Sequence, residues 1–190
     1  IVFVPAMGWQ DYNYIKYARV AEEDPNAVVS FHYYLPMLLS HYKMLAWVGY
    51  QGAVQYPGVV IPTQSDADKY PQYASFHKTT YNADRIMGEM SNAASDGRNA
   101  GLAVHCGEFG CSKNVAEAMR LAWFTDMVAA MEANNIPWTL WECLDGGFGF
   151  VDMEYGIYRI NCPLLKVLTG KELTDAEAKV LLQKYGFKTE

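Results

Sequence analysis

The sequence predicts an α/β protein whose strands form one parallel sheet, and two observations support this. Four short apolar stretches recur along the 190 residues, and each is followed by a loop rich in Trp, Tyr or Gly and then by a helical stretch. The composition, 51% hydrophobic and 14% aromatic, is typical of a chain that buries a core. Because no Ser/Gly-rich linker or low-complexity run divides the chain, a single domain is predicted.

The first unit opens with an apolar strand over residues 1–5. Its loop carries Trp9, and a helix is predicted over residues 12–23. The sequence Asp24-Pro-Asn26 then ends the helix, because proline and asparagine favour a turn.

The second unit opens with a strand over residues 27–33, where valines and aromatic residues dominate. A long excursion to about residue 78 follows the strand. A helix is predicted over residues 81–94, and it closes near Gly97.

The third and fourth units repeat the pattern. A strand over 101–106 precedes a long helix over 113–133, and a strand over 137–141 precedes a loop over 142–153 and a helical segment near 163–168. The predicted inner face of the long helix consists of Val115, Ala118, Met119, Ala122 and Ala129.

The tail over residues 171–190 adds one more helix to the same domain. Its start carries a capping box in Thr174-Asp-Ala-Glu177, and its end carries Gly186. Residues 1–170 hold the four strand-helix units. Because a closed barrel needs eight strands and about 250 residues, these four units predict half of a (β/α)8 TIM barrel.

The charge pattern argues against two classes of partner. The chain has 15 basic and 21 acidic residues, and no Lys/Arg cluster could follow a phosphate backbone, so no nucleic acid is expected. Its apolar runs are too short to span a membrane, and no signal peptide opens the chain. The start at Ile1, inside a strand-like run, suggests missing upstream sequence or processing.

The cysteines and histidines do not have the spacing of metal ligands, so neither a metal nor another cofactor is expected. Cys106 and Cys143 fall near the ends of two strands that could be adjacent. A disulfide between them is compatible with this placement, but buried free thiols are favoured.

A carboxylate between glycines is the feature of the third strand that calls for a function. The segment Gly107-Glu-Phe-Gly110 ends this strand, and strict alternation sends Val104, Cys106 and Glu108 to one face. The glycines let backbone or ligand approach the carboxylate closely. The alternative is a solvated loop glutamate before a helix, which is common at strand ends.

Polar and aromatic side chains gather at the other strand ends as well. The carboxyl ends of parallel strands meet at one mouth, where strand-helix barrels keep their reactive groups. Aromatic faces stack on sugar rings, and a carboxylate attacks or stabilises an anomeric centre, so this set suits a carbohydrate. The residues at the four ends are Trp9, His32, Tyr34, Glu108, Trp141 and Glu142.

Several motifs follow one another in order from Trp9 to about Phe150. They are Ser30-Phe-His-Tyr-Tyr-Leu-Pro36, Ser40-His41 with Trp47, Tyr56-Pro-Gly58, Gly107-Glu-Phe-Gly110, Arg120 with Trp123, Ile136-Pro-Trp-Thr-Leu-Trp-Glu142, and Gly147-Phe-Gly149. Together they resemble the C-terminal half of glycoside hydrolase family 5, the retaining cellulase-type (β/α)8 barrels, from its fifth strand to its eighth.

The resemblance implies a role for each of four residues. Glu108 would be the nucleophile that forms a covalent glycosyl-enzyme intermediate, and Tyr34 would donate a hydrogen bond to it. His32 would contact substrate hydroxyls, and Trp141 would form the platform under the reacting sugar. Each also has a structural interpretation, since His32 and Tyr34 could fill the core and Trp141 could pack like Trp138.

The resemblance further implies a β-1,4-glucan or a cello-oligosaccharide as the substrate, and secretion from the cell. The Tyr-Pro-Gly and Ser-His-Trp segments favour this glucan by analogy. Trp9, His41 and Trp47 are further candidates for substrate binding, although aromatic loops also pack on themselves.

Half of the active site is missing from the sequence. A retaining glycosidase needs a second carboxyl group about 5 Å from the nucleophile, and the family takes it from an Asn-Glu-Pro motif that this chain lacks. Closure of two copies about a two-fold axis would supply four more strands. Glu142 or Asp145 of the second copy could then replace the acid/base, although Glu142 could equally be an exposed loop residue.

Two other functions remain open at this point. The chain could be a catalytically silent half-barrel, natural or truncated, that binds glucan through its tryptophans. It could also be a structural domain whose aromatic residues are core. Covalent labelling of Glu108 would distinguish a catalyst from both.

Overall fold

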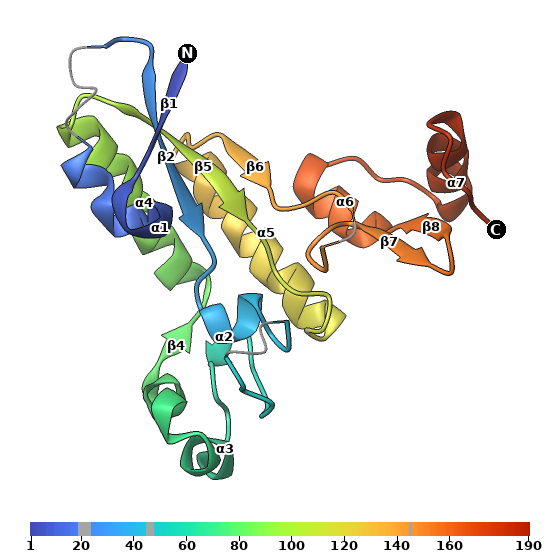
Figure 1. Cartoon of the computed structure of the whole chain (residues 1–190), viewed down its shortest axis with the longest axis horizontal. Helices are drawn as coiled ribbons and strands as arrows, with labels where there is room; N and C mark the ends of the chain where they lie inside the picture. Colours follow the sequence, from blue (N-terminus) through green and yellow to red (C-terminus); the bar gives the residue numbers. More distant parts are fainter. Residues whose placement is uncertain (19–23, 45–47, 145) are drawn as a thin grey trace.

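A parallel sheet of four strands forms the centre of the molecule. The structure is a computed structural model that describes residues 1–18, 24–44, 48–144 and 146–190 (Figure 1). The sheet has the order β1-β2-β5-β6, and every neighbouring pair is parallel. Its strands are β1 (Val2–Pro5), β2 (Ala27–Tyr33), β5 (Ala103–Phe109) and β6 (Trp138–Leu140). The predicted parallel α/β fold is therefore confirmed.

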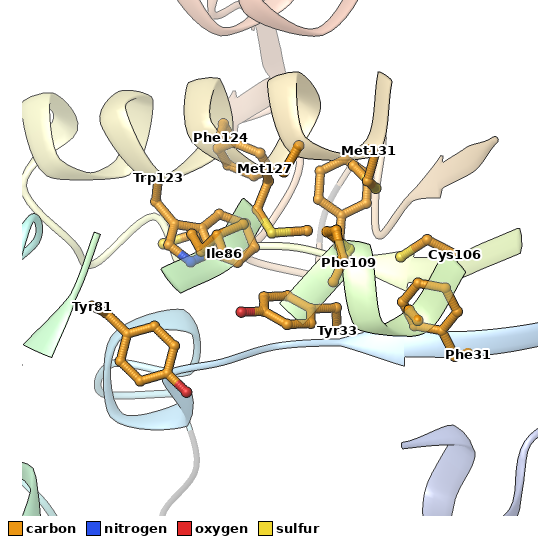
Figure 2. Packing of buried hydrophobic residues seen from close by; sticks show 14 of the residues in the cluster. Phe31, Tyr33, Tyr81, Ile86, Cys106, Phe109, Trp123, Phe124, Met127 and Met131 are labelled. Carbon is orange, nitrogen blue, oxygen red and sulfur yellow. The ribbon is translucent and has the colours of Figure 1, made fainter. Parts of the chain in front are cut away.

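Two long helices cover one face of the sheet. Helices α4 (Ala83–Asn99) and α5 (Glu117–Ala133) pack against each other (Figure 1). Figure 2 shows the layer between them and the sheet, where aromatic rings and methionines interlock. Its fully buried members include Phe31, Tyr33, Cys106, Phe109, Ile86, Trp123, Phe124, Met127 and Met131. This layer is the main hydrophobic core. Burial of each such side chain stabilises the folded state by about 1.5–3 kcal/mol.

The inner face of α5 differs from the prediction. The side chains that it buries are Arg120, Trp123, Phe124, Met127, Val128, Ala130 and Met131, whereas the predicted Ala118 and Ala129 are exposed. Val115 is buried but precedes the helix, and Met119 and Ala122 are half-buried. The large side chains take the sheet-facing positions because they bury the most apolar surface. Alanines fit either side of a helix and do not define its face.

The first predicted helix is also different. Residues 12–17 form a short 3-10 helix, η1 (Tyr12–Tyr17), preceded by one turn, α1 (Met7–Gln10). Ala18 ends η1, and residues 19–23 of the predicted span lie outside the described residues. The Asp11 side chain accepts a hydrogen bond from the Asn13 backbone and so fixes the start of η1. Aromatic residues of low helix propensity follow, which favours a short turn over a long helix.

The excursion after β2 has structure of its own. Its elements are α2 (Met37–Ser40), β3 (Gly58–Val59), α3 (Gln64–Lys69), η3 (Pro71–Lys78) and β4 (Thr80–Tyr81). β3 and β4 form a small antiparallel pair. The excursion leaves the sheet at the carboxyl end of β2 and returns to α4 (Figure 1).

A hairpin that the sequence did not predict follows β6. Strands β7 (Val151–Glu154) and β8 (Ile157–Ile160) are antiparallel, and β7 begins within the predicted loop over 142–153. Helix α6 (Cys162–Thr169) packs on α5, and α7 (Asp175–Lys184) packs on β8. The capping box at the start of α7 is present as predicted.

The second face of the sheet is open. Phe3 of β1 and His105 of β5 meet there with ring centroids 5.0 Å apart, and Phe3 remains 56% exposed. Side chains from alternate strands share layers in this way inside a closed barrel. Among the described residues, no strand pairs with the outer edge of β1 or of β6. The sheet therefore has two unpaired edges and a partly bare face.

Candidate active site

A bulge in β5 decides which way Glu108 points. Phe31 of β2 pairs with Cys106, but the next residue, His32, pairs with Glu108, so Gly107 is an extra residue in β5. Strict alternation had placed Glu108 on the face of Cys106, and this expectation is wrong. Cys106 is buried against the helices, whereas Glu108 lies on the open face beside His32.

Gly107 is the residue that this bulge requires. A Cβ atom at position 107 would lie 2.4 Å from Ser30 Oγ, a distance that real Cβ atoms do not tolerate. Ser30 is itself 7% exposed and has little room to move. The glycine before Glu108 therefore serves close packing between β2 and β5.

Two side chains hold the Glu108 carboxylate. Tyr34 Oη donates a hydrogen bond of 2.8 Å to Glu108 Oε2, and His32 Nδ1 lies 3.4 Å from the same oxygen. Burial lowers the pKa of His32, although the nearby Glu108 charge opposes this shift. Burial and then the hydrogen bond to Glu108 raise the pKa of Tyr34 well above its ordinary value. At neutral pH the carboxylate therefore faces a phenol that keeps its proton and an uncharged imidazole.

Behind Tyr34 lies a group of side chains that fixes its ring. Ser40 Oγ donates to the Tyr34 carbonyl and lies 3.0 Å from His41 Nδ1. The ring centroids of His41 and Phe148 lie 4.8 and 5.9 Å from the centroid of the Tyr34 ring. They lie 5.2 Å from each other. Burial lowers the pKa of His41, so an uncharged ring packs here. Phe148 and Ser40 are the supporting residues that sequence reasoning missed, although both stand inside its motifs.

A cavity of about 610 Å³ opens on the β1 side of this site. Trp9 stands at its rim with its side chain 99% exposed. Gly8, Trp9 and Gln10 have φ angles of 63°, 62° and 61°. All three lie in the left-handed region of the backbone, which residues other than glycine rarely adopt. The cavity is lined by Gly8, Trp9, Asp11, Tyr12, His32, Tyr34, Leu35, Met37 and His41. Three predicted site residues thus share a cavity with Trp9.

Trp141 and Glu142 follow β6 on the other side of Glu108. Trp141 is 46% exposed, and its backbone N–H donates to the Phe109 carbonyl at 3.0 Å. Glu142 is half-buried and turned into its own loop, where a Cβ atom on Gly146 would lie 2.0 Å from Glu142 Oε1. This buried Oε1 has no hydrogen-bond partner among the described residues. Trp47 and Asp145 lie outside the described residues.

The chemistry of the site follows from these contacts. Within the described part of the chain, the hydrogen bonds and ion pairs of the Glu108 carboxylate go to Tyr34 and His32 alone. Both engage Oε2, so Oε1 is the oxygen left available on the open face. A partly exposed carboxylate oxygen next to two neutral polar groups can attack an electrophilic carbon.

Other reactive groups of the chain lie apart from this site. All four cysteines are free; Cys106 and Cys111 are buried, whereas Cys143, predicted to be a buried thiol, is exposed. Over the described ranges, no three His, Cys, Asp or Glu side chains lie close enough to hold a metal ion. None of the helices described is long and apolar enough to cross a membrane.

Comparisons with known proteins find similarity to cellulases. The family model described as cellulase (glycosyl hydrolase family 5) matches residues 1–147. Endoglucanase C of Acetivibrio thermocellus is 22% identical over 143 residues, which cover 72% of this chain and 39% of that protein. Endoglucanase C307 of Clostridium sp. (strain F1) matches to the same extent.

Solved structures of cellulases have the same fold. A hyperthermophilic endo-β-1,4-glucanase in complex with substrate superposes with a TM-score of 0.66 at 21% identity, over 90% of this chain and 47% of that one. A Thermotoga maritima endoglucanase with cellobiose gives a TM-score of 0.63 at 18% identity, over 88% and 47%. The chain thus spans about half the length of these structures, and its four-stranded sheet is half of a (β/α)8 barrel.

Proposed function

Because this chain belongs to glycosyl hydrolase family 5, we propose that it provides the nucleophile half of the active site of a retaining β-1,4-glucan hydrolase. The observation that carries this proposal is the placement of Glu108 on the open face, with Tyr34 Oη and His32 Nδ1 on its Oε2. In this proposal Glu108 Oε1 attacks the anomeric carbon and forms a covalent glycosyl-enzyme, while the glycosidic C–O bond breaks and the leaving oxygen takes a proton from the acid/base. Water, activated by the same acid/base, then hydrolyses the glycosyl-enzyme.

Tyr34 and His32 assist this nucleophile in different ways. The Tyr34 hydrogen bond orients the carboxylate, and it stabilises the charge that returns to Glu108 when the glycosyl group leaves. His32 is uncharged at neutral pH because burial lowers its pKa, so its ring does not neutralise the nucleophile and can bind a sugar hydroxyl.

The sugar chain is proposed to cross the mouth of the half-barrel. Trp141, 46% exposed beside Glu108, is the platform for the reacting sugar, and the cavity with Trp9 and His41 takes the next units. Trp47 is proposed as a further contact. Cello-oligosaccharides or β-glucan are the expected ligands, and because the polymer is insoluble, an extracellular location is proposed.

The acid/base is proposed to come from a complementing half-barrel, of which a second copy of this chain is the simplest. Two features support such closure: the unpaired edges of β1 and β6, and Phe3 on the open face of the sheet, which is 56% exposed. Glu142 of the second copy, or Asp145, is the candidate acid. Glu142 would first have to turn out of its own loop.

An activated inhibitor tests the nucleophile without requiring the acid. Dinitrophenyl 2-deoxy-2-fluoro-β-cellobioside carries a leaving group that departs without protonation, so the chain alone should gain the mass of one fluorocellobiosyl group. Peptide mapping should place it on Glu108, and Glu108→Gln should remain unlabelled. Binding of cello-oligosaccharide without labelling would instead indicate a catalytically silent half-barrel. The supporting observation is that, among the described residues, the contacts of the Glu108 carboxylate go to Tyr34 and His32 and not to a second carboxyl group.

The complementation proposal has its own test. Light scattering should give twice the chain mass of 21.4 kDa if a second copy closes the barrel. Glu142→Gln should then lower turnover of an aryl cellobioside at least about a hundredfold while the mass stays doubled. A monomer at all concentrations would refute the second copy as the source of the acid. Unchanged turnover in Glu142→Gln and also in Asp145→Asn would refute it as well.

A further inference from the structure

Arg120 is a buried cation whose hydrogen bonds go to backbone carbonyls. It is 4% exposed, and its Nε donates to the Cys111 carbonyl at 2.8 Å. Its Nη2 donates to the carbonyl of Gly149 at 2.9 Å and to that of Phe148. No carboxylate in the described ranges lies within ion-pair distance of it. Burial of a charge without an ionic partner is costly, and here the dipoles of the three carbonyls compensate for that cost.

The three carbonyls belong to two segments that are far apart in the sequence. Cys111 follows the nucleophile strand by two residues, whereas Phe148 and Gly149 lie in the loop after β6. Lys113 adds a second connection, since its N–H donates to the Gly147 carbonyl and its Nζ to the Val151 carbonyl, both at 2.8 Å. The end of β5 and the loop after β6 are thus joined by charge-assisted hydrogen bonds.

This loop reaches the candidate nucleophile through one aromatic ring. Phe148 contacts the Tyr34 and His41 rings, and Tyr34 donates to Glu108. The loop also starts from Trp141, the proposed sugar platform. A shift of the Phe148 backbone would therefore move the support of Tyr34 and the end of the platform together.

We infer that Arg120 is a positioning residue, which holds loop residues 146–150 so that Phe148 supports the Tyr34 hydroxyl against Glu108. Its effect on sugar chemistry rests on the proposed function, but its effect on the loop does not. The competing interpretation is that Arg120 only stabilises the core, where its guanidinium lies 5.3 Å from the centroid of the Phe124 ring.

Hydrogen exchange without any sugar tests the position of the loop. In Arg120→Met, peptides over 142–151 should exchange at least about tenfold faster, because three charge-assisted bonds to the loop and to Cys111 are lost. Peptides from α4 should keep their rates. Arg120→Lys should lie between the two, since one ammonium reaches fewer carbonyls. Arg85→Lys is the matched control, because the hydrogen bonds that Arg85 makes within the described residues go to Glu89 and the Thr80 carbonyl, away from the loop.

A titration of His41 by NMR gives a signature that a purely stabilising role would not move. The ring packs against Phe148, and its burial lowers its pKa. Departure of the loop should raise this pKa towards its ordinary value in Arg120→Met, at temperatures where the variant is folded. Unchanged loop exchange, exchange that rises equally in α4, or an unmoved His41 pKa would overturn the inference.

The fluoroglycoside adds the arm that depends on the proposed function. Arg120→Met should slow the maximal labelling rate towards the roughly tenfold loss expected of Tyr34→Phe, because Tyr34 loses its support, and it should also weaken the inhibitor's Ki, because the platform moves. A labelling rate and a Ki that are both unchanged would overturn a role for Arg120 at the sugar site. If the unaltered chain is not labelled, the proposed function fails, and the exchange and titration results still decide the role of Arg120 in the loop.

Discussion

Replacement of Gly107 by alanine should destabilise the chain through one contact. The added Cβ would lie 2.4 Å from Ser30 Oγ, and the other atoms near it, both of His32, are at 3.6 and 3.7 Å. Overpacking of this kind costs about 1–3 kcal/mol, whereas the stiffer unfolded chain returns about 0.4–1 kcal/mol. The midpoints of these ranges, about 2 and about 0.7 kcal/mol, leave a net loss of about 1.3 kcal/mol. In a domain of this size it lowers the melting temperature by about 3–5 °C.

Scanning calorimetry measures this shift, and a second substitution tests its cause. Ser30→Ala removes the clashing oxygen, so Gly107→Ala combined with Ser30→Ala should recover at least half of the loss relative to Ser30→Ala alone. Gly88→Ala is the matched control, because nothing lies within 4 Å of its added Cβ in the middle of α4. That control should gain about 0.5–1 kcal/mol. A melting temperature of Gly107→Ala equal to that of the parent, or no recovery in the double variant, would refute the packing account of the bulge.

Three further predictions follow from the site. Tyr34→Phe should slow labelling of Glu108 about tenfold. A hydrogen bond to a charged group contributes about 1.5–3 kcal/mol, and the low end applies to a carboxylate that is 28% exposed. Mass spectrometry of the inhibitor adduct measures the labelling rate, and an unchanged rate contradicts this prediction. The free energy of unfolding should fall as pH drops from 7.5 to 5.5. Burial lowers the pKa of His41 in the folded state, so the unfolded chain binds more protons at this residue in that range. In urea titrations His41→Asn should reduce the dependence of this free energy on pH, and an equal dependence would exclude His41 as a cause. Maleimide should modify the exposed Cys143 of the native chain and spare Cys111. Cys111 is buried, and its burial raises the pKa of its thiol to about 12. Peptide mapping identifies the modified cysteine, and early modification of Cys111 would show that the core opens.

The order and direction of the strands could be predicted because their signal is local. The valines and aromatic residues of Ala27–Tyr33 favour a strand whatever surrounds it, and strand-helix alternation then requires parallel pairing. The gathering of His32, Tyr34 and Glu108 could be predicted for a similar reason, since parallel strands end at one edge.

The bulge at Gly107 could not be predicted in the same way. An inserted residue leaves the local sequence strand-like, and its presence depends on pairing with β2, which is a tertiary contact. The prediction of which face of α5 is buried failed for another reason. Its apolar residues surround the helix, so only competition for the sheet decides which of them are buried.

The hairpin of β7 and β8 did leave a signal. Tyr155 and Gly156 both have positive φ, at 51° and 77°, and they connect two stretches of alternating residues. Asn-Gly or Asp-Gly is the usual sequence for such a turn, and a tyrosine in the first position conceals it. An X-Gly pair between alternating stretches would have been sufficient reason to predict a hairpin here.

The two unpaired edges of the sheet limit which other half could ever replace the missing one. A barrel closes only if the stagger of its strands sums to a fixed total, and the register shifts at His32 and after Cys106 already contribute part of that total. A foreign half must therefore match β1 and β6 at once, because a one-residue error at either junction turns the side chains of that strand to the wrong face. Exchange of halves between members of this family should succeed only where the bulge before the proposed nucleophile is shared.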